Sequence, residues 1–321
     1  MTRNKFVISI LFLGVLLGII YLTQPSDLPT LYTEGDKIMR ADTGEPIILR
    51  GIVSDYFRYD FNYDYPEKSG GLKTELERID QLQEMGADIN MVGLYLARLD
   101  KTKANIEEMD QYIEYASDHG MYVFLAPAGI GFLETNPKKE IKTDEEYWRN
   151  VGPNDLAELT EFLADRYGNF SNVMYQLTAE PGITSIAWRT KQRELAEIVR
   201  KYTDNPIIVS TPLYVAYPSL PILPFKNIIY STGGYVSRVD TSFVERTTEG
   251  ILWTTAGKES SIKNYPIIVA EFGGNYGGDF STMRDLELFK NLLEAIQDAG
   301  LSHTAYRFRR EPFFYRYRHD H

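Results

Sequence analysis

Asn172–Pro181 reads NVMYQLTAEP, a short apolar segment that ends in a carboxylate and a proline. The run Val173–Leu177 predicts a buried strand. Pro181 has no backbone N–H and disfavours helical conformation in the residue before it, so we expect this strand to stop at Glu180. The sequence therefore predicts a carboxylate at the C-terminal end of a buried strand.

A second stretch, Pro266–Gly274, has the same organisation and reads PIIVAEFGG. Four apolar residues precede Glu271, which lies about 90 residues after Glu180. A barrel of parallel strands brings the C-terminal ends of its strands to one rim, where two such carboxylates would meet. Paired carboxylates are the working groups of glycoside hydrolysis. The alternative for either glutamate alone is that it caps the following helix or pairs with an arginine.

Strand-like and helix-like patterns alternate over most of the chain, which indicates an α/β fold. The predicted strands are 51–54, 89–96, 121–126, 173–177, 206–210, 227–231, 267–270 and 302–308, and the predicted helices are 72–85, 106–116, 155–167, 183–202, 243–256 and 283–299. This number of strands and helices fits a (β/α)8 TIM barrel. A doubly wound open sheet is the alternative, although no glycine-rich phosphate fingerprint follows the first strand. Because little sequence follows the last strand, we expect a regular eighth helix to be missing or replaced.

The N-terminal residues predict an export segment. Residues 1–23 contain an apolar run, Phe6–Leu22, preceded by Arg3 and Lys5. The run is just long enough to span a bilayer, and the flanking positive charge predicts a single-pass membrane protein with an extracytoplasmic domain. A cleaved signal peptide, giving a secreted protein, is the alternative.

The remainder divides into a linker, a barrel domain and a tail. We expect a linker at 24–35, the barrel at 36–310 and an aromatic, basic tail at 311–321. The barrel domain should open with a hairpin, in which 36–40 and 45–50 flank the turn Asp42–Gly44.

Composition limits the possible partners. The formal net charge is −11, which argues against nucleic acid as a partner. The chain has no cysteine, so thiolate and zinc–cysteine chemistry are excluded. Its 23 tyrosines offer flat apolar faces that suit sugar rings, or pack in the core. We predict no metal site, because the fragment Asp60-x-Asn62-x-Asp64 lacks the glycine and the closing acidic residue of a calcium loop. The oligomeric state is left open.

The chain resembles glycoside hydrolase family 5, the cellulase-like barrels, between about Asp36 and Phe308. The segments that carry the resemblance are TGEPIILRG (Thr43–Gly51), QLTAEP (Gln176–Pro181) and PIIVAEFG (Pro266–Gly273). The resemblance implies a retaining β-glycosidase acting on a glucan, mannan or related glycan without a cofactor. It implies that Glu180 is the general acid and base and that Glu271 is the nucleophile. Retention requires the two carboxyl groups to lie about 5–5.5 Å apart.

Several positions differ from the pattern of that family. Ala179 stands where an asparagine holds the sugar 2-hydroxyl, Gly93 where an arginine steadies the nucleophile, and Ala126–Pro127 where a histidine is expected. Of a His-x-Tyr motif only Tyr235 remains, and Tyr306 lies where a tryptophan is usual. These differences motivate another hypothesis, a catalytically inactive, membrane-anchored carbohydrate-binding barrel. A third hypothesis, a structural partner in an envelope complex, rests on the barrel surface that a missing eighth helix would leave uncovered.

Aromatic residues outside these motifs are further candidates for substrate binding. Tyr56 belongs to an aromatic-rich loop after the first strand, and Trp148 precedes the helix predicted at 155–167. Either could stack on a sugar ring at the mouth of the barrel. The alternatives are that the loop aromatics pack on one another and that Trp148 packs a lid. The expected site is thus Glu180 and Glu271 for catalysis, with Ala179, Tyr235, Tyr56, Trp148 and Tyr306 around the substrate.

Overall fold

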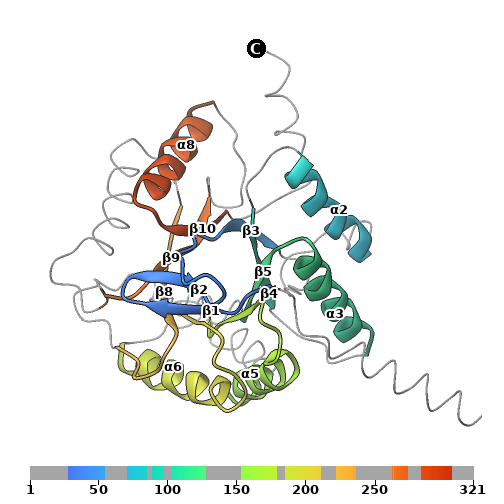
Figure 1. Cartoon of the computed structure of the whole chain (residues 1–321), viewed down its shortest axis with the longest axis vertical. Coiled ribbons are helices and arrows are strands. Elements are labelled where there is room, and N and C mark those ends of the chain that lie inside the picture. Colours follow the sequence, from blue (N-terminus) through green and yellow to red (C-terminus); the bar gives the residue numbers. More distant parts are fainter. Residues whose placement is uncertain are drawn as a thin grey trace, which may run out of the picture.

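The computed structural model describes residues 28–54, 71–84, 89–96, 103–127, 153–178, 185–210, 222–235, 262, 264–273 and 283–305. Eight parallel strands within them form a closed barrel (Figure 1). In chain order they are β3 (Arg50–Ser54), β4 (Met91–Leu96), β5 (Tyr122–Pro127), β6 (Val173–Gln176), β7 (Ile207–Ser210), β8 (Ile228–Tyr235), β9 (Ile267–Gly273) and β10 (Ser302–Ala305). Closure between β10 and β3 confirms the predicted (β/α)8 barrel and excludes the open sheet.

Helices lie against much of the outer face of this barrel (Figure 1). They are α2 (Gly71–Glu84), α3 (Lys103–Asp118), α5 (Pro153–Tyr167), α6 (Ser185–Val199) and α8 (Met283–Asp298). Gly120 and Gly300 follow α3 and α8 with φ of 72° and 68°, the left-handed conformation that ends helices. These helices agree with the predicted ones. The predicted helix 243–256 and the segment after β10 lie outside the described residues.

An additional hairpin precedes the predicted one. It consists of β1 (Leu31–Glu34) and β2 (Lys37–Arg40), joined by a turn at Gly35–Asp36. β1 lies within 24–35, the segment that we expected to be a linker. The predicted hairpin follows it. The arm 45–50 returns along β2 through the bridge between Pro46 and Met39 and through the bonds from Arg40 N to Glu45 O and from Ile47 N to Ile38 O, both 2.9 Å. Gly35, with φ of 58°, turns the first hairpin, and Gly44, with φ of 67°, belongs to the turn predicted at Asp42–Gly44.

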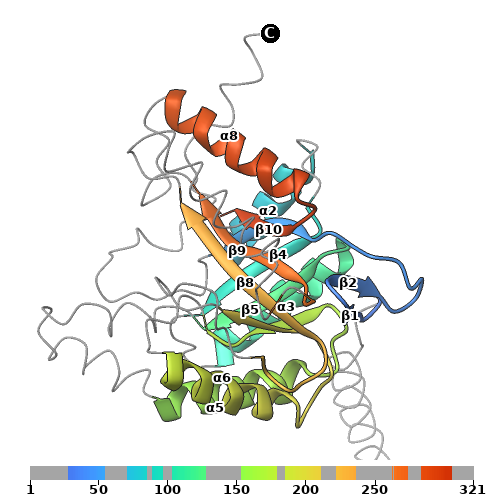
Figure 2. The same cartoon turned by 90° about the vertical axis from the view of Figure 1, so that its left-hand side faces the viewer.

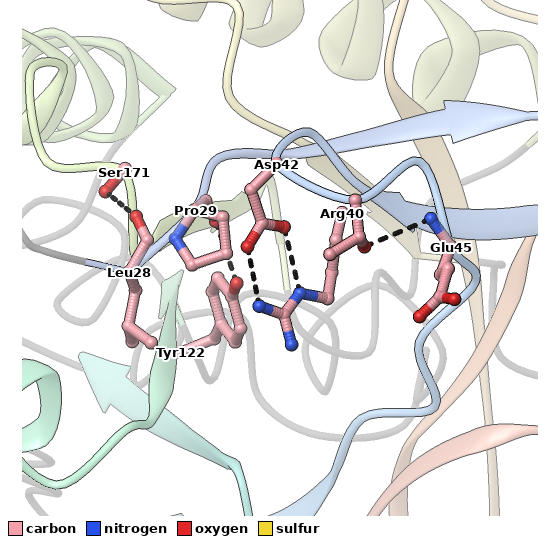
Figure 3. Close-up of polar contacts among 8 residues, drawn as sticks. Leu28, Pro29, Arg40, Asp42, Glu45, Tyr122 and Ser171 are labelled. Carbon is pink, nitrogen blue, oxygen red and sulfur yellow. Dashed lines mark hydrogen bonds and ion pairs between the residues drawn. The ribbon is translucent and has the colours of Figure 1, made fainter.

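The hairpin β1–β2 closes the N-terminal end of the barrel. Leu31 and Ile38 pack with the side chains of the barrel interior. Tyr122, the first residue of β5, donates a hydrogen bond to Pro29 O at 2.7 Å, and Ser171, just before β6, donates to Leu28 O at 2.5 Å (Figure 3). Figure 2 shows the hairpin on the side from which β8 starts, away from its arrowhead. The other end of the barrel, where the strands finish, is therefore the end that can receive a substrate.

Two glycines allow close packing on one side of the barrel. A Cβ on Gly51 of β3 would lie 1.8 Å from the carbonyl oxygen of Met91. A Cβ on Gly93 of β4 would lie 2.1 Å from Cζ of Phe124, the fully buried phenyl ring on the neighbouring strand β5. Phe124 thus fills the space in front of Gly93, the position at which the family resemblance leads one to expect arginine.

Among the residues that the structure describes, no helix has both the length and the apolar character needed to cross a bilayer. The apolar run predicted as a signal anchor, 6–22, lies outside those residues, as does the tail 311–321.

Buried tyrosine hydroxyls predict a loss of stability at high pH. Burial raises the pKa of Tyr122 and that of Tyr230 from 10.0 to about 12. A group whose pKa is higher in the folded state stabilises fully below its unfolded pKa, and this contribution is lost as the pH rises through the folded value. We expect the free energy of unfolding, measured by urea denaturation, to fall above about pH 10.

The matched variant for this prediction is Tyr122→Phe. It should lower the free energy of unfolding by about 0.5–1.5 kcal/mol at pH 8, because it removes the hydrogen bond to Pro29. Its loss of stability between about pH 10 and 12 should also be shallower than that of the wild type. Equal pH slopes in the two proteins would show that Tyr122 does not contribute to the alkaline loss.

The contact between Gly93 and Phe124 can be tested by a double-mutant cycle. Gly93→Ala should destabilise the protein by about 1–3 kcal/mol, since the new methyl group overlaps a fully buried ring. In a Phe124→Leu background the same change should cost clearly less, because the shorter side chain leaves room for the methyl group. Additive effects of the two substitutions in urea unfolding would contradict this packing.

Candidate active site

Strand β9 carries Glu271 at the end of the barrel where the strands finish. The strand runs through Ile267–Gly273, so Glu271 lies within it and Phe272 and Gly273 follow in the same strand. The prediction that the strand ends at this glutamate is therefore wrong by two residues. The side chain is buried, with 8% of its surface exposed. A buried carboxylate inside a strand needs a structural reason to face the barrel mouth instead of the helices.

A β-bulge in β9 supplies that reason. Against β8, Val269 pairs with Thr232 while Glu271 pairs with Gly233, so one residue of β9 is extra. Against β10, Val269 pairs with His303 while Phe272 pairs with Ala305, which gives the same excess of one residue. A bulge places two residues of one strand opposite one of its neighbour and shifts the side-chain alternation beyond it. Both neighbouring strands thus place the bulge at Ala270–Glu271.

The bulge turns Glu271 into the barrel. Ala270 packs with the interior residues, so strict alternation would place Glu271 outside and Phe272 inside. Instead Phe272 belongs to the outer core and stacks on Phe289 of α8, with ring centroids 5.3 Å apart. Glu271 is paired with Gly233, which lies two residues beyond the inward Ser231. Paired residues of neighbouring strands share a face, so the carboxylate of Glu271 lies on the inner face.

The inner face changes from apolar to polar along strands β6, β7 and β8. Met174, Ile208 and Ile229 face inward first and pack with the apolar interior. Two residues later on each strand stand Gln176, Ser210 and Ser231, all buried. The Gln176 amide donates to Ser210 Oγ at 2.8 Å, and Ser231 Oγ donates to Ser210 Oγ at 3.2 Å. A hydrogen-bonded polar layer therefore underlies the mouth of the barrel beside Glu271.

The polar layer also fixes the segment that leads to Glu180. Ser210 donates its hydroxyl proton to Thr178 O, and the Gln176 amide reaches the same oxygen at 3.4 Å. Gln192 of α6 donates to Thr178 Oγ1 at 2.7 Å. Thr178 is the last described residue of this segment, and Glu180 comes two residues later. Ala179 and Glu180 themselves lie outside the described residues.

The side-chain oxygen of Gln176 can still accept a hydrogen bond. Its side chain is 4% exposed, and its amide oxygen has no partner among the described residues. Buried acceptors are normally paired, with water if not with protein. This oxygen is therefore suited to accept a hydrogen bond from water or from a hydroxyl-rich ligand at the barrel mouth.

The other predicted site residues are only partly placed. Tyr235 is the last residue of β8, two residues after the glycine that pairs with Glu271. Tyr56, Trp148 and Tyr306 lie outside the described residues. Within the described part of the chain, no group of three histidine, aspartate or glutamate side chains could hold a metal ion.

Sequence reasoning missed the polar layer, although it left a signal. Gln176, Ser210 and Ser231 each interrupt an apolar run, in VMYQ, IIVS and IIYS. At period two, each shares a face with the apolar residue two positions earlier, so each is a buried polar group facing inward. Gln192 left no such signal, because a polar residue on a helix is usually exposed.

A family model described as Cellulase (glycosyl hydrolase family 5) matches residues 73–311. No curated protein sequence matches the chain. Among solved structures, a β-glucanase from Saccharophagus degradans in complex with cellotetraose shares 18% identity, with a TM-score of 0.66 and coverage of 89% of this chain and 85% of that chain. At this level of identity the likeness shows the shared fold.

Two further solved structures agree with that fold. The catalytic domain of Thermobifida fusca endoglucanase Cel5A shares 17% identity over 88% of this chain and 86% of that chain, with a TM-score of 0.62. Cellulose synthase subunit Z from Clostridioides difficile shares 16% identity over 82% of this chain and 93% of that chain, with a TM-score of 0.63. With the family model spanning most of the 321 residues, the chain belongs to the cellulase family, glycosyl hydrolase family 5, and is a glycoside hydrolase.

Proposed function

We propose that the protein is a retaining glycoside hydrolase that cleaves a β-linked glucan by double displacement. Glu271 is the nucleophile, and Glu180 is the general acid and then the general base. The observation that carries the proposal is the bulge in β9, which turns a buried carboxylate into the mouth of a closed barrel. A structural carboxylate on β9 would need no such break in the alternation of side chains.

The chemistry assigned to Glu271 follows from its position. In the first step its carboxylate attacks the anomeric carbon, while Glu180 protonates the departing glycosidic oxygen. In the second step Glu180 removes a proton from water, which displaces Glu271 and releases the sugar with its original configuration. Gly233, opposite Glu271, has no side chain that could occupy the space a sugar ring needs on that side.

The role of Glu180 rests on the segment that leads to it. Three hydrogen bonds, from Gln176, Ser210 and Gln192, hold Thr178 at the end of the β6 segment. Catalytic groups require such support, because loosely held side chains lose productive geometry. A network of this kind two residues before Glu180 supports a role for that residue at the barrel mouth.

A β-glucan is the substrate class that the family favours. The matched family is described as cellulase, and the similar solved structures include a β-glucanase in complex with cellotetraose. The acidic net charge of −11 is compatible with a neutral polysaccharide and unfavourable for a polyanionic one.

The sequence and the fold together support a membrane-anchored enzyme whose active site faces away from the bilayer. The apolar run 6–22 follows Arg3 and Lys5, as in a signal anchor. Leu28 and Pro29 are bound at the N-terminal end of the barrel, opposite the end that carries Glu271. A chain that enters at that end holds the barrel mouth outward, where it can reach a polymer.

Replacing the two glutamates by glutamine should separate their roles. On β-glucan both Glu271→Gln and Glu180→Gln should lower kcat by at least about 10²-fold. On a dinitrophenyl β-cellobioside, whose leaving group needs no protonation, Glu180→Gln should still release dinitrophenol in a burst while Glu271→Gln should not. Stopped-flow absorbance measures both, and Glu287→Gln, on the exposed face of α8, is the matched control.

The same experiment tests the binding-only alternative. A wild-type protein that binds β-glucan but releases no reducing ends, with binding unchanged in Glu271→Gln, would establish a non-catalytic carbohydrate-binding barrel. Full activity in Glu271→Gln would instead show that another residue is the nucleophile.

Anchoring is tested separately by fractionation. The full chain should remain in the membrane pellet after washing at alkaline pH, because an apolar span is held by the hydrophobic effect. A chain starting at Leu28 should be found in the soluble fraction with unchanged activity on β-glucan. Recovery of the full chain in the culture supernatant, shortened near residue 23, would show that the segment is a cleaved signal peptide.

A further inference from the structure

At the bulge in β9, a buried backbone carbonyl accepts a hydrogen bond from a side chain of the next strand, β10. An extra residue in a strand interrupts the ladder, so one carbonyl loses its regular partner. Here Thr304 of β10 donates its hydroxyl hydrogen bond to Ala270 O, at the bulge itself. Thr304 is fully buried, and Ala270 is 3% exposed. Because water is excluded from this position, the hydroxyl supplies the carbonyl with a hydrogen bond from inside the protein.

Thr304 is held in place for this bond, because strand pairing fixes the backbone on both sides of it. The residues before and after it, His303 and Ala305, pair with Val269 and Phe272 across the bulge. On its other side Thr304 pairs with Gly51 of β3, which packs tightly on β4. A β-branched side chain also has few rotamers, so the hydroxyl has little freedom to turn elsewhere.

We propose that Thr304 is a positioning residue for catalysis, whose hydroxyl holds the bulge that turns Glu271 into the barrel mouth. This inference rests on the proposed role of Glu271 as nucleophile. Without the hydroxyl, Ala270 O loses a buried hydrogen bond in the bulged strand, an unfavourable change. The strand can recover a carbonyl partner by returning to regular pairing with β10. Regular alternation would turn Glu271 outward and Phe272 inward.

The outer core opposes that change and determines its extent. Phe272 stacks on Phe289 and meets the edge of the His303 ring, with centroids 5.3 and 5.7 Å away. These contacts resist a full slip, so loss of the hydroxyl should displace Glu271 by a fraction of a residue spacing. A displacement of about 1 Å is enough to reduce catalysis by up to about 10²-fold.

The test compares Thr304→Val and Thr304→Ser with wild type, using β-glucan as substrate. The valine variant keeps the shape and removes the hydroxyl, so kcat should fall about 10- to 100-fold while KM changes less than about 3-fold. Thr304→Ser keeps the hydroxyl and should restore most of kcat. If the valine variant does not fold, Thr304→Ala provides the same comparison.

Ser302→Ala is the matched control. Ser302 is a buried hydroxyl on the same strand, and it accepts a hydrogen bond from Leu49 N at 2.9 Å. Its loss should reduce stability without a selective fall in kcat, because its bond fastens the segment before β3 and leaves the bulge intact. Equal effects of Ser302→Ala and Thr304→Val on kcat would show that Thr304 is merely structural.

The outcomes for this inference and for the proposed function can be told apart. If wild type hydrolyses β-glucan and Thr304→Val keeps its kcat, the positioning role is wrong and the proposed function stands. If wild type hydrolyses no β-glucan, the proposed function fails, and a crystal structure of Thr304→Val decides the positioning role. An unchanged β9–β10 register and Glu271 position in that structure would overturn it, and a shifted register would support it.

Discussion

Side chains alternate between the two faces of a β-strand, and β9 has to break this alternation to place the right residues both against the helices and at the barrel mouth. Its outer face must present Val269 and Phe272 to the helices, while its inner face must present Glu271 to the barrel mouth. One extra residue solves the conflict, because it turns Glu271 inward and Phe272 outward. The stacking of Phe272 on Phe289 and the hydrogen bond from Thr304 hold the strand in this arrangement.

The two ends of the barrel have different physical tasks. At the N-terminal end, the hairpin β1–β2 and an inner layer of apolar side chains exclude water, and the bonds to Leu28 and Pro29 fasten the incoming chain. Toward the other end, the inner layer on β6, β7 and β8 becomes polar, and its hydrogen bonds meet at Ser210. One end is thus closed by apolar packing, and the chemistry we propose is placed at the other.

The sequence was sufficient for the barrel and for the strand that carries Glu271, but not for how Glu271 is aimed. Apolar runs and helix-ending glycines are local signals, so the order of strands and helices could be predicted from the sequence alone. Their regular alternation predicted the closed barrel. The hairpin with its turn at Asp42–Gly44 forms as predicted, but β1, which pairs with β2 across the turn at Gly35, was not expected, because its residues lie in the segment predicted to be a linker. The bulge at Ala270–Glu271 could not be predicted, since it depends on the register with two strands that lie elsewhere in the sequence. The interior packing of Phe124 on Gly93 is likewise a contact between strands.

The most direct measurement of the central claim is covalent trapping of the nucleophile. A 2-deoxy-2-fluoro-β-cellobioside with a dinitrophenyl leaving group should form the glycosyl–enzyme and then hydrolyse slowly, because fluorine slows both steps while the leaving group accelerates the first. Peptide mass spectrometry of the trapped protein should find the sugar on Glu271. A label on any other residue, or turnover of the substrate without a covalent intermediate, would contradict the assignment of Glu271 as the nucleophile that the bulge in β9 positions.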